Sequence, residues 1–215
     1  GDFSDIFEGL FGGGAGGRRP GGFGGGGAGG GFGGFGGQQG PAKRGANVAY
    51  KLRVPFVDAA TLAPQRITLA DGKTIDLKLP NGVETGTQMK LAGMGQLGPG
   101  GTGDAIVTVE IDKHAFFVRD GDNVWLDLPI SLVEAVNGAR VKVPTVDGPV
   151  MLNVPANSRS GQQLRLKGKG FTKKDGQRGD QMVTFLIDVP ADDAALKQFT
   201  AAWSDDRALR THLGV

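Results

Sequence analysis

From Val48 to Ile187 the apolar residues recur at every second position, in short segments separated by turns. "TIDLKL" (74–79), "IVTVEI" (106–111) and "VWLDL" (124–128) all show this period of two, and Asp-Gly pairs recur between such segments. An Asp-Gly pair between alternating segments is typical of a hairpin turn. The pattern predicts a mostly β fold of antiparallel strands in which each sheet buries one face. Only 56–60 and 131–136 interrupt it with a short helical turn.

The β region is an internal repeat. "PNGVETGTQMKLAGMG" (80–95) aligns without gaps on "PANSRSGQQLRLKGKG" (155–170). "GDAIVTVEID" (103–112) matches "GDQMVTFLID" (179–188) at six of ten positions. The duplication predicts two β-domains in tandem.

The start of the chain has a different composition. Residues 1–40 hold 21 of the 40 glycines and six of the twelve phenylalanines. Between Gly12 and Gly40 no aliphatic side chain exceeds alanine, so burial cannot offset about 1–2 kcal/mol per residue of backbone ordering. We predict a disordered Gly/Phe-rich linker over 1–44. Within it, "FSDIFEGLF" (3–11) places its apolar residues on one helical face, which either docks on a partner or has none.

The glycines at 93, 95 and 98 have the G-x-G-x-x-G spacing of a dinucleotide-binding loop. The second repeat keeps only the first two, as Gly168 and Gly170, and a predicted strand follows the loop in the first repeat. Because a bound pyrophosphate needs the N-terminus of a helix, a nucleotide site is not expected here. Gly93 and Gly95 are instead interpreted as turn residues with positive φ.

Other catalytic and metal-binding patterns are equally absent from the sequence. It contains no cysteine, two histidines (His114 and His212), no G-x-S-x-G motif and no run of eighteen apolar residues. Two tandem β-domains without such patterns indicate a binding protein with no catalytic residue, metal or cofactor, and not an enzyme. No membrane segment or signal peptide is predicted, so we expect a cytoplasmic protein.

Several stretches, in order, resemble the DnaJ-type co-chaperones that lack a zinc finger (class B), and are similar to their curved-DNA-binding CbpA branch. They are "FSDIFEGLFGG", the Gly/Phe tract, "LPNGVETGTQMKLAGMG", the run from "HAFFVRDGDNVWLDLP" to "VDGPVMLNVP", "SGQQLRLKGKG" and "RGDQMVTFLIDVP". The resemblance covers nearly the whole chain. One feature departs from it: the family begins with a J-domain that carries His-Pro-Asp, and this tripeptide does not occur here. Stimulation of a DnaK ATPase is therefore not assigned to these residues.

The resemblance implies β-sandwich domains at 45–118 and 119–190 and a C-terminal helical segment at 191–215 that forms a homodimer. It implies that unfolded polypeptide clients bind a shallow apolar groove on the first sandwich and are delivered to a DnaK-type chaperone. The implied groove residues are Val48, Ile67, Leu69, Phe116 and Phe117. The alternative is that Ile67 and Leu69 are core residues that face inward. Arg66 is the candidate contact for the acidic tail of the partner chaperone.

Two further roles follow from the resemblance. The helix at 3–11 would dock on a J-domain through Phe3, Ile6, Phe7 and Phe11. The stripe of Leu196, Phe199 and Trp203 in the last segment would dimerise the protein, unless it packs on its own second domain.

A basic cluster gives the alternative function. Between 159 and 178 the chain carries seven Lys or Arg residues and one acid, Asp175. Such a cluster could bind a DNA backbone without sequence preference and place the protein at the nucleoid, or could be an ordinary solvated face. Its members are Arg159, Arg165, Lys167, Lys169, Lys173, Lys174 and Arg178.

Overall fold

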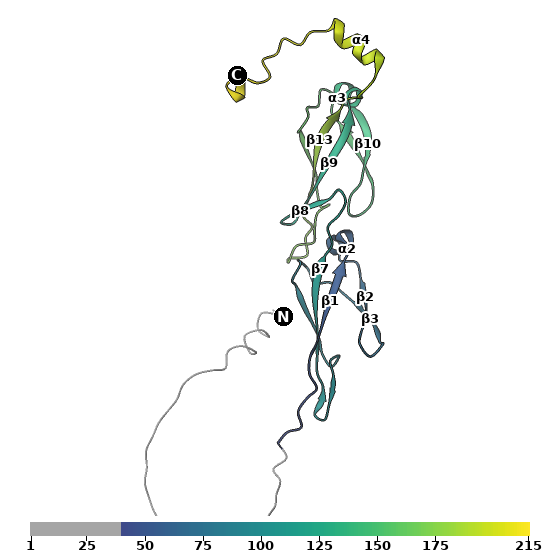
Figure 1. Cartoon of the computed structure of the whole chain (residues 1–215), viewed down its shortest axis with the longest axis vertical. Coiled ribbons are helices and arrows are strands. Elements are labelled where there is room, and N and C mark those ends of the chain that lie inside the picture. The colour runs from purple at the N-terminus through teal and green to yellow at the C-terminus, as the bar shows by residue number, and fades with distance from the viewer. Residues whose placement is uncertain (1–39) are drawn as a thin grey trace, which may run out of the picture. The chain divides into compact units, whose positions relative to one another are not determined.

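The computed structural model describes residues 40–215. This part of the chain is mostly strand, arranged as two β-sandwich repeats with a short C-terminal helix (Figure 1). The mostly β fold and the duplication are thus confirmed. The Gly/Phe tract and the predicted helix at 3–11, with Phe3, Ile6, Phe7 and Phe11, lie outside the described residues.

The first repeat contains seven strands and one helix. The central sheet has the order β1-β7-β4, and β2-β3 and β5-β6 form two small sheets beside it. The elements are β1 (Val48–Val54), α2 (Phe56–Thr61), β2 (Gln65–Thr68), β3 (Thr74–Leu77), β4 (Gln88–Leu91), β5 (Leu97–Gly98), β6 (Gly101–Thr102) and β7 (Ala105–Ile111).

The second repeat keeps the central sheet and one small sheet, adds β8 to the central sheet and, within the described residues, has no two-stranded sheet like β5-β6. Its central sheet has the order β12-β13-β9-β8, and β10-β11 form the small sheet. The elements are β8 (Val118–Asp120), β9 (Asn123–Ser131), α3 (Leu132–Asn137), β10 (Ala139–Val143), β11 (Val150–Val154), β12 (Gln163–Leu166) and β13 (Gln181–Asp188), followed by α4 (Ala194–Ala202) and a 3-10 turn at Thr211–Leu213. Both helical turns predicted from the sequence, α2 and α3, are present.

Two strand pairs are parallel, so the prediction of wholly antiparallel sheets was wrong. β1 pairs with β7, and β9 pairs with β13, in the parallel direction. An alternating pattern reports that one face of a strand is buried, and it carries no information about the direction of the neighbour. The connection from β1 to β7 spans about fifty residues with α2 and two small sheets in it, which is ample for the crossover that parallel strands require.

The alternating residues form the core. Val54, Val107 and Val109 are fully buried in the first repeat, as are Val183 and Phe185 in the second. The buried residues of both repeats belong to one continuous cluster. This continuity comes from a junction at which the repeats bond to each other directly.

The junction joins α2 to a loop of the second repeat. The Ala60 carbonyl, at the C-terminal end of α2, accepts both the N–H and the hydroxyl of Thr172, at 3.2 and 3.1 Å. Carbonyls in the last turn of a helix have no partner within the helix, and Thr172 supplies one. Next to it, the rings of Phe56 and Phe171 meet edge to face with centroids 5.1 Å apart. The Arg119 guanidinium lies 3.8 Å above the centre of the Phe171 ring.

Each repeat also closes with the same polar contact. In the first, Asp104 accepts the N–H of Gly93 at 2.9 Å, and in the second, Asp180 accepts that of Gly168 at 2.8 Å. Gly93 and Gly168 both have φ of +70°, which confirms the turn interpretation for Gly93. It was wrong for Gly95, which has no positive φ: a Cβ there would lie 2.6 Å from the backbone N of Asp104.

The C-terminal segment is largely exposed. Asp193 is the N-cap of α4, and its carboxylate accepts the N–H of Leu196 at 2.8 Å. Leu196 is half-buried, whereas Phe199 and Trp203 are 61% and 56% exposed and stack on each other. Because α4 buries no residue, its stripe is not covered by the second repeat. Across residues 40–215 no helix is long and apolar enough to cross a membrane.

Candidate functional site

Strand β2 has one free edge. In the described part of the chain it pairs with β3 alone (Figure 1). The N–H of Leu69 donates to the Lys73 carbonyl at 2.8 Å, so the backbone of Leu69 faces β3. Along an antiparallel strand, the N–H and C=O groups of one residue point to one side, and those of the next residue point to the other side. The residues of β2 whose N–H and C=O groups face the free edge are therefore Arg66 and Thr68. The N–H of Ala70, in the turn after β2, points the same way, because the Leu69 carbonyl of the same peptide accepts the N–H of Gly72 on the β3 side.

This edge is short and bounded at both ends. Arg66 and Thr68 are exposed, and they offer the open backbone groups. Before them, Pro64 has no N–H to donate. After them, the Ala70 N–H is already used, because it donates to the hydroxyl of Tyr50 at 3.0 Å. An extended segment could thus pair with the edge at Arg66 and Thr68.

The apolar residues of β1 and β2 differ in exposure. Val48 and Tyr50, on the core-facing side of β1, are half-buried. Ile67 and Leu69 face inward and are only 8% and 4% exposed. This placement agrees with the alternative that Ile67 and Leu69 are core residues. Contact between these two side chains and a client stays a prediction.

Phe116 and Phe117 lie at the other end of β1. Phe117 is 4% exposed and stacks on Phe56, the first residue of α2 and two residues after the end of β1. At about 3.3 Å per residue, the two ends of β1 are about 20 Å apart, so Val48 lies far from the Phe117 end of the strand. Ile67 and Phe117 belong to the same buried cluster. Phe116 is 49% exposed. His114 fixes the turn, since its Nδ1 accepts the N–H groups of Phe116 and Phe117 at 3.3 Å.

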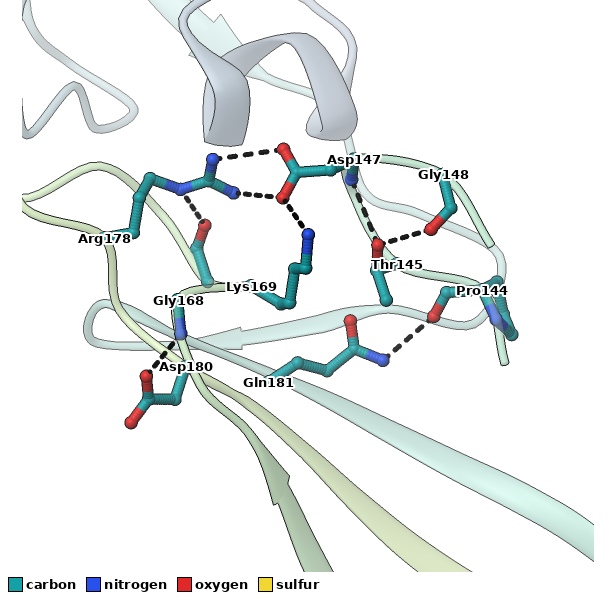
Figure 2. A network of polar contacts seen from close by, with 10 residues as sticks. Pro144, Thr145, Asp147, Gly148, Gly168, Lys169, Arg178, Asp180 and Gln181 are labelled. Carbon is teal, nitrogen blue, oxygen red and sulfur yellow. Dashed lines mark hydrogen bonds and ion pairs between the residues drawn. The ribbon is translucent and has the colours of Figure 1, made fainter. Parts of the chain in front are cut away.

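The equivalent edge in the second repeat is closed. The shift of 76 that aligns Asp71-Gly72 on Asp147-Gly148 places Thr68 on Pro144. Pro144 has no N–H, and its carbonyl accepts the side-chain amide of the fully buried Gln181 at 2.9 Å (Figure 2). The first repeat has Ala105 where the second has Gln181, so no amide can reach the Thr68 carbonyl in this way.

The neighbouring central strand shows the same contrast. In the second repeat β8 pairs along the outer edge of β9, whereas in the first repeat the outer edge of β1 has no strand partner within the described residues. Val124 of β9 is fully buried, and its counterpart Val48 is half-buried. The two repeats share a fold, but only the first offers an open edge beside partly exposed apolar side chains.

The basic cluster is partly neutralised. The two terminal guanidinium nitrogens of Arg178 donate to the Asp147 carboxylate at 3.1 and 3.2 Å, and the Lys169 ammonium lies 3.4 Å from the same carboxylate (Figure 2). Burial raises the pKa of Asp147, but these contacts outweigh burial and hold the pKa below its usual value. A carboxylate held in this way offsets part of the positive charge that the sequence places here.

The remaining basic residues are more open. Arg165 lies 3.7 Å from Asp180, a weak contact at an exposed position. Arg159, Lys167 and Lys174 are exposed and Lys173 is half-buried. DNA binding through the cluster stays a prediction. No group of metal-ligating residues is found in the described residues.

Sequence reasoning missed the residues that define the edge. Thr68 and Ala70 contribute backbone groups. The direction of these groups depends on the pairing of β2 with β3 and cannot be recognised from the residue types. Tyr50, the only tyrosine, was not singled out. One signal was available: the repeat alignment pairs Thr68 with Pro144, and proline at one copy of a strand position marks a backbone difference.

Comparison with known proteins agrees with this architecture. The chain is similar to the chaperone protein DnaJ of Bacillus cytotoxicus, with 39% identity over 145 residues. That similarity covers 64% of this chain and 40% of the relative, so the aligned part is less than half of the relative's length. Residues 48–190 match the model of the DnaJ C terminal domain. Because the match runs through all the strands of both repeats, the chain belongs to the DnaJ C-terminal domain family.

Proposed function

We propose that the chain binds unfolded polypeptides through the free edge of β2 and delivers them to a DnaK-type chaperone. Family membership supports a chaperone or co-chaperone role. The observation that carries the site is the contrast between the repeats, since the edge is open at Thr68 and closed at Pro144. The lack of any cysteine supports a place among the members without a zinc finger, such as the CbpA branch.

Binding would proceed by strand addition. A client segment in extended conformation pairs with the backbone of Arg66 and Thr68, and its alternate side chains contact the apolar surface of Val48 and Tyr50. Main-chain hydrogen bonds do not depend on the client's side chains, and apolar contacts are not directional. The site would therefore bind many different client sequences. The small number of edge positions keeps the affinity low and the release fast, which suits delivery to a second chaperone.

The edge is tested by proline substitution. Thr68→Pro removes an edge N–H and is expected to weaken binding of an unfolded client by about tenfold or more, because the ring also blocks the approach of the new strand. The matched control is Thr74→Pro. Thr68 and Thr74 are directly opposed, and their hydroxyls bond each other at 3.3 Å, so both variants lose this bond. Only Thr68 faces the proposed edge, because the backbone groups of Thr74 point the other way.

The measurement is fluorescence anisotropy of a labelled, reduced and unfolded client, together with suppression of its aggregation on heating. Circular dichroism first establishes that both variants are folded. Loss of binding in Thr68→Pro alone supports the edge. Equal binding by Thr68→Pro and the unsubstituted chain would move the client site elsewhere.

Arg66 fits a second role at the same edge. Its guanidinium donates to Asp76 at 2.9 Å and stays largely exposed, and this bond lowers the pKa of Asp76. We infer that an acidic tail of the partner chaperone would compete with Asp76 for Arg66. Such a contact would place the incoming chaperone next to the bound client.

We also propose that the exposed stripe of α4 joins two copies of the chain. Burial of Phe199 and Trp203 against a second copy would remove two large apolar side chains from water. Phe199→Ser is expected to lower the molar mass measured by light scattering from that of a dimer toward that of a monomer. Gln198→Ser, on an adjacent exposed position of α4, should leave the mass unchanged. A monomeric unsubstituted chain at micromolar concentration would rule the proposal out.

A further inference from the structure

We propose that Tyr50 limits the length of the client strand by occupying the place of a client carbonyl. The inference rests on the proposed client site at β2. The next N–H after those of Arg66 and Thr68 that points away from β3 belongs to Ala70, in the turn that follows β2, because the Leu69 carbonyl of the same peptide accepts the N–H of Gly72. In this structure that N–H donates to the Tyr50 hydroxyl at 3.0 Å.

The hydroxyl meets the requirement for a carbonyl substitute. It accepts the N–H of Ala70, which the carbonyl of an added strand would otherwise accept, and it belongs to β1, a strand of a different sheet from β2. Tyr50 is half-buried against the core, so packing holds the ring in place. A client that pairs beyond Thr68 must therefore displace a bond that the protein already makes.

This arrangement also accounts for how the exposed edge is protected. An unpaired strand edge invites association with other chains, and proteins shorten such edges to prevent it. Pro64 ends the edge before Arg66, and the Tyr50 hydroxyl ends it after Thr68. The second repeat has Leu126 in place of Tyr50, without a hydroxyl, and there Pro144 closes the edge directly. The tyrosine thus leaves the first repeat partly open, with two positions for a client.

The test is Tyr50→Phe, which removes the hydroxyl and keeps the ring. The probe is a labelled synthetic peptide of alternating leucine and serine, long enough to span the three edge positions. We expect Tyr50→Phe to bind it about two- to tenfold more tightly, the range that one hydrogen bond provides. Adding Thr68→Pro should abolish the gain, since the strand then cannot pair next to Ala70.

Hydrogen exchange of the Ala70 amide, followed by NMR, separates this role from a general loosening of the repeat. In the free unsubstituted chain the amide should be protected by Tyr50, and in free Tyr50→Phe it should exchange fast. Peptide binding should restore protection in Tyr50→Phe. Unchanged affinity, or an Ala70 amide that stays unprotected with peptide bound, would overturn the role of Tyr50 while the client site stands. Peptide binding that is insensitive to Thr68→Pro would instead overturn the site itself.

Discussion

Phe171→Ala is expected to lower the free energy of unfolding by about 3–5 kcal/mol, the cost of deleting a large buried aromatic side chain. Phe171 is 1% exposed and lies at the junction of the repeats, edge to face with Phe56. Its removal leaves a cavity at the place where the core of one repeat continues into the other.

Arg119 increases this cost. Its guanidinium lies on the Phe171 ring and donates to the Val83 carbonyl of the first repeat at 2.9 Å. Burial lowers the pKa of Arg119, so the charged form has already lost hydration and depends on these partners. Without the ring, the Arg119 guanidinium remains partly shielded from water but no longer has the cation–π contact that offsets this cost.

Urea unfolding followed by circular dichroism measures the change, with the slope of the transition as a check on cooperativity. Phe199→Ala is the matched control, because Phe199 is 61% exposed and should change stability by less than about 1 kcal/mol at concentrations where the chain is monomeric. A similar small change for Phe171→Ala would mean that the repeats are stable without the junction. A second unfolding transition in that variant would show that the ring couples them.

The positions of the strands could be predicted from the sequence, but the direction in which they pair could not. Val107, Val109, Val183 and Phe185 were placed on buried faces by their spacing of two, and all four are fully buried. The direction of β7 beside β1 could not be read in this way, since alternation depends on which face is covered and not on the neighbour's polarity. The duplication was visible because both copies must keep the same turns.

The candidate site was harder to predict because it depends on backbone groups. Ile67 and Leu69 were found as apolar residues, but whether they face a client or the core depends on how the β2-β3 hairpin packs. The open edge at Thr68 depends on which strand is absent, and the bond from Ala70 to Tyr50 joins residues twenty positions apart. Neither the open edge nor this bond can be recognised from composition. Only the alignment of Thr68 with Pro144 between the two copies indicated that the edges differ.

Gly170→Ala is expected to cost more stability than Gly168→Ala, although Gly168 is the one with positive φ. At Gly168 an added Cβ meets nothing within 4 Å, so alanine there pays only for a left-handed backbone, about 1–2 kcal/mol. At Gly170 it would lie 2.4 Å from the Asp122 carbonyl oxygen and 2.6 Å from the carbonyl carbon of Gly179. Both obstacles are backbone atoms, in the segments that lead into β9 and β13, and they move only if these segments shift, so we expect about 3 kcal/mol or more.

Thermal unfolding of the two variants decides between two reasons for the glycines. If close approach of backbone is the main requirement, Gly170→Ala melts well below Gly168→Ala, and Gly95→Ala in the first repeat behaves likewise, since its Cβ would lie 2.6 Å from the Asp104 nitrogen. If Gly168→Ala is the more damaging, turn conformation is what the glycines provide. The first outcome would mean that the second glycine of each G-x-G is needed for close packing. Each one lies against the segment that enters the repeat (Ala46 or Asp122) and against the loop before the last long strand (Gly103 or Gly179). Close packing of the backbone would then explain why G-x-G recurs in both repeats, although only the first copy completes the G-x-G-x-x-G spacing.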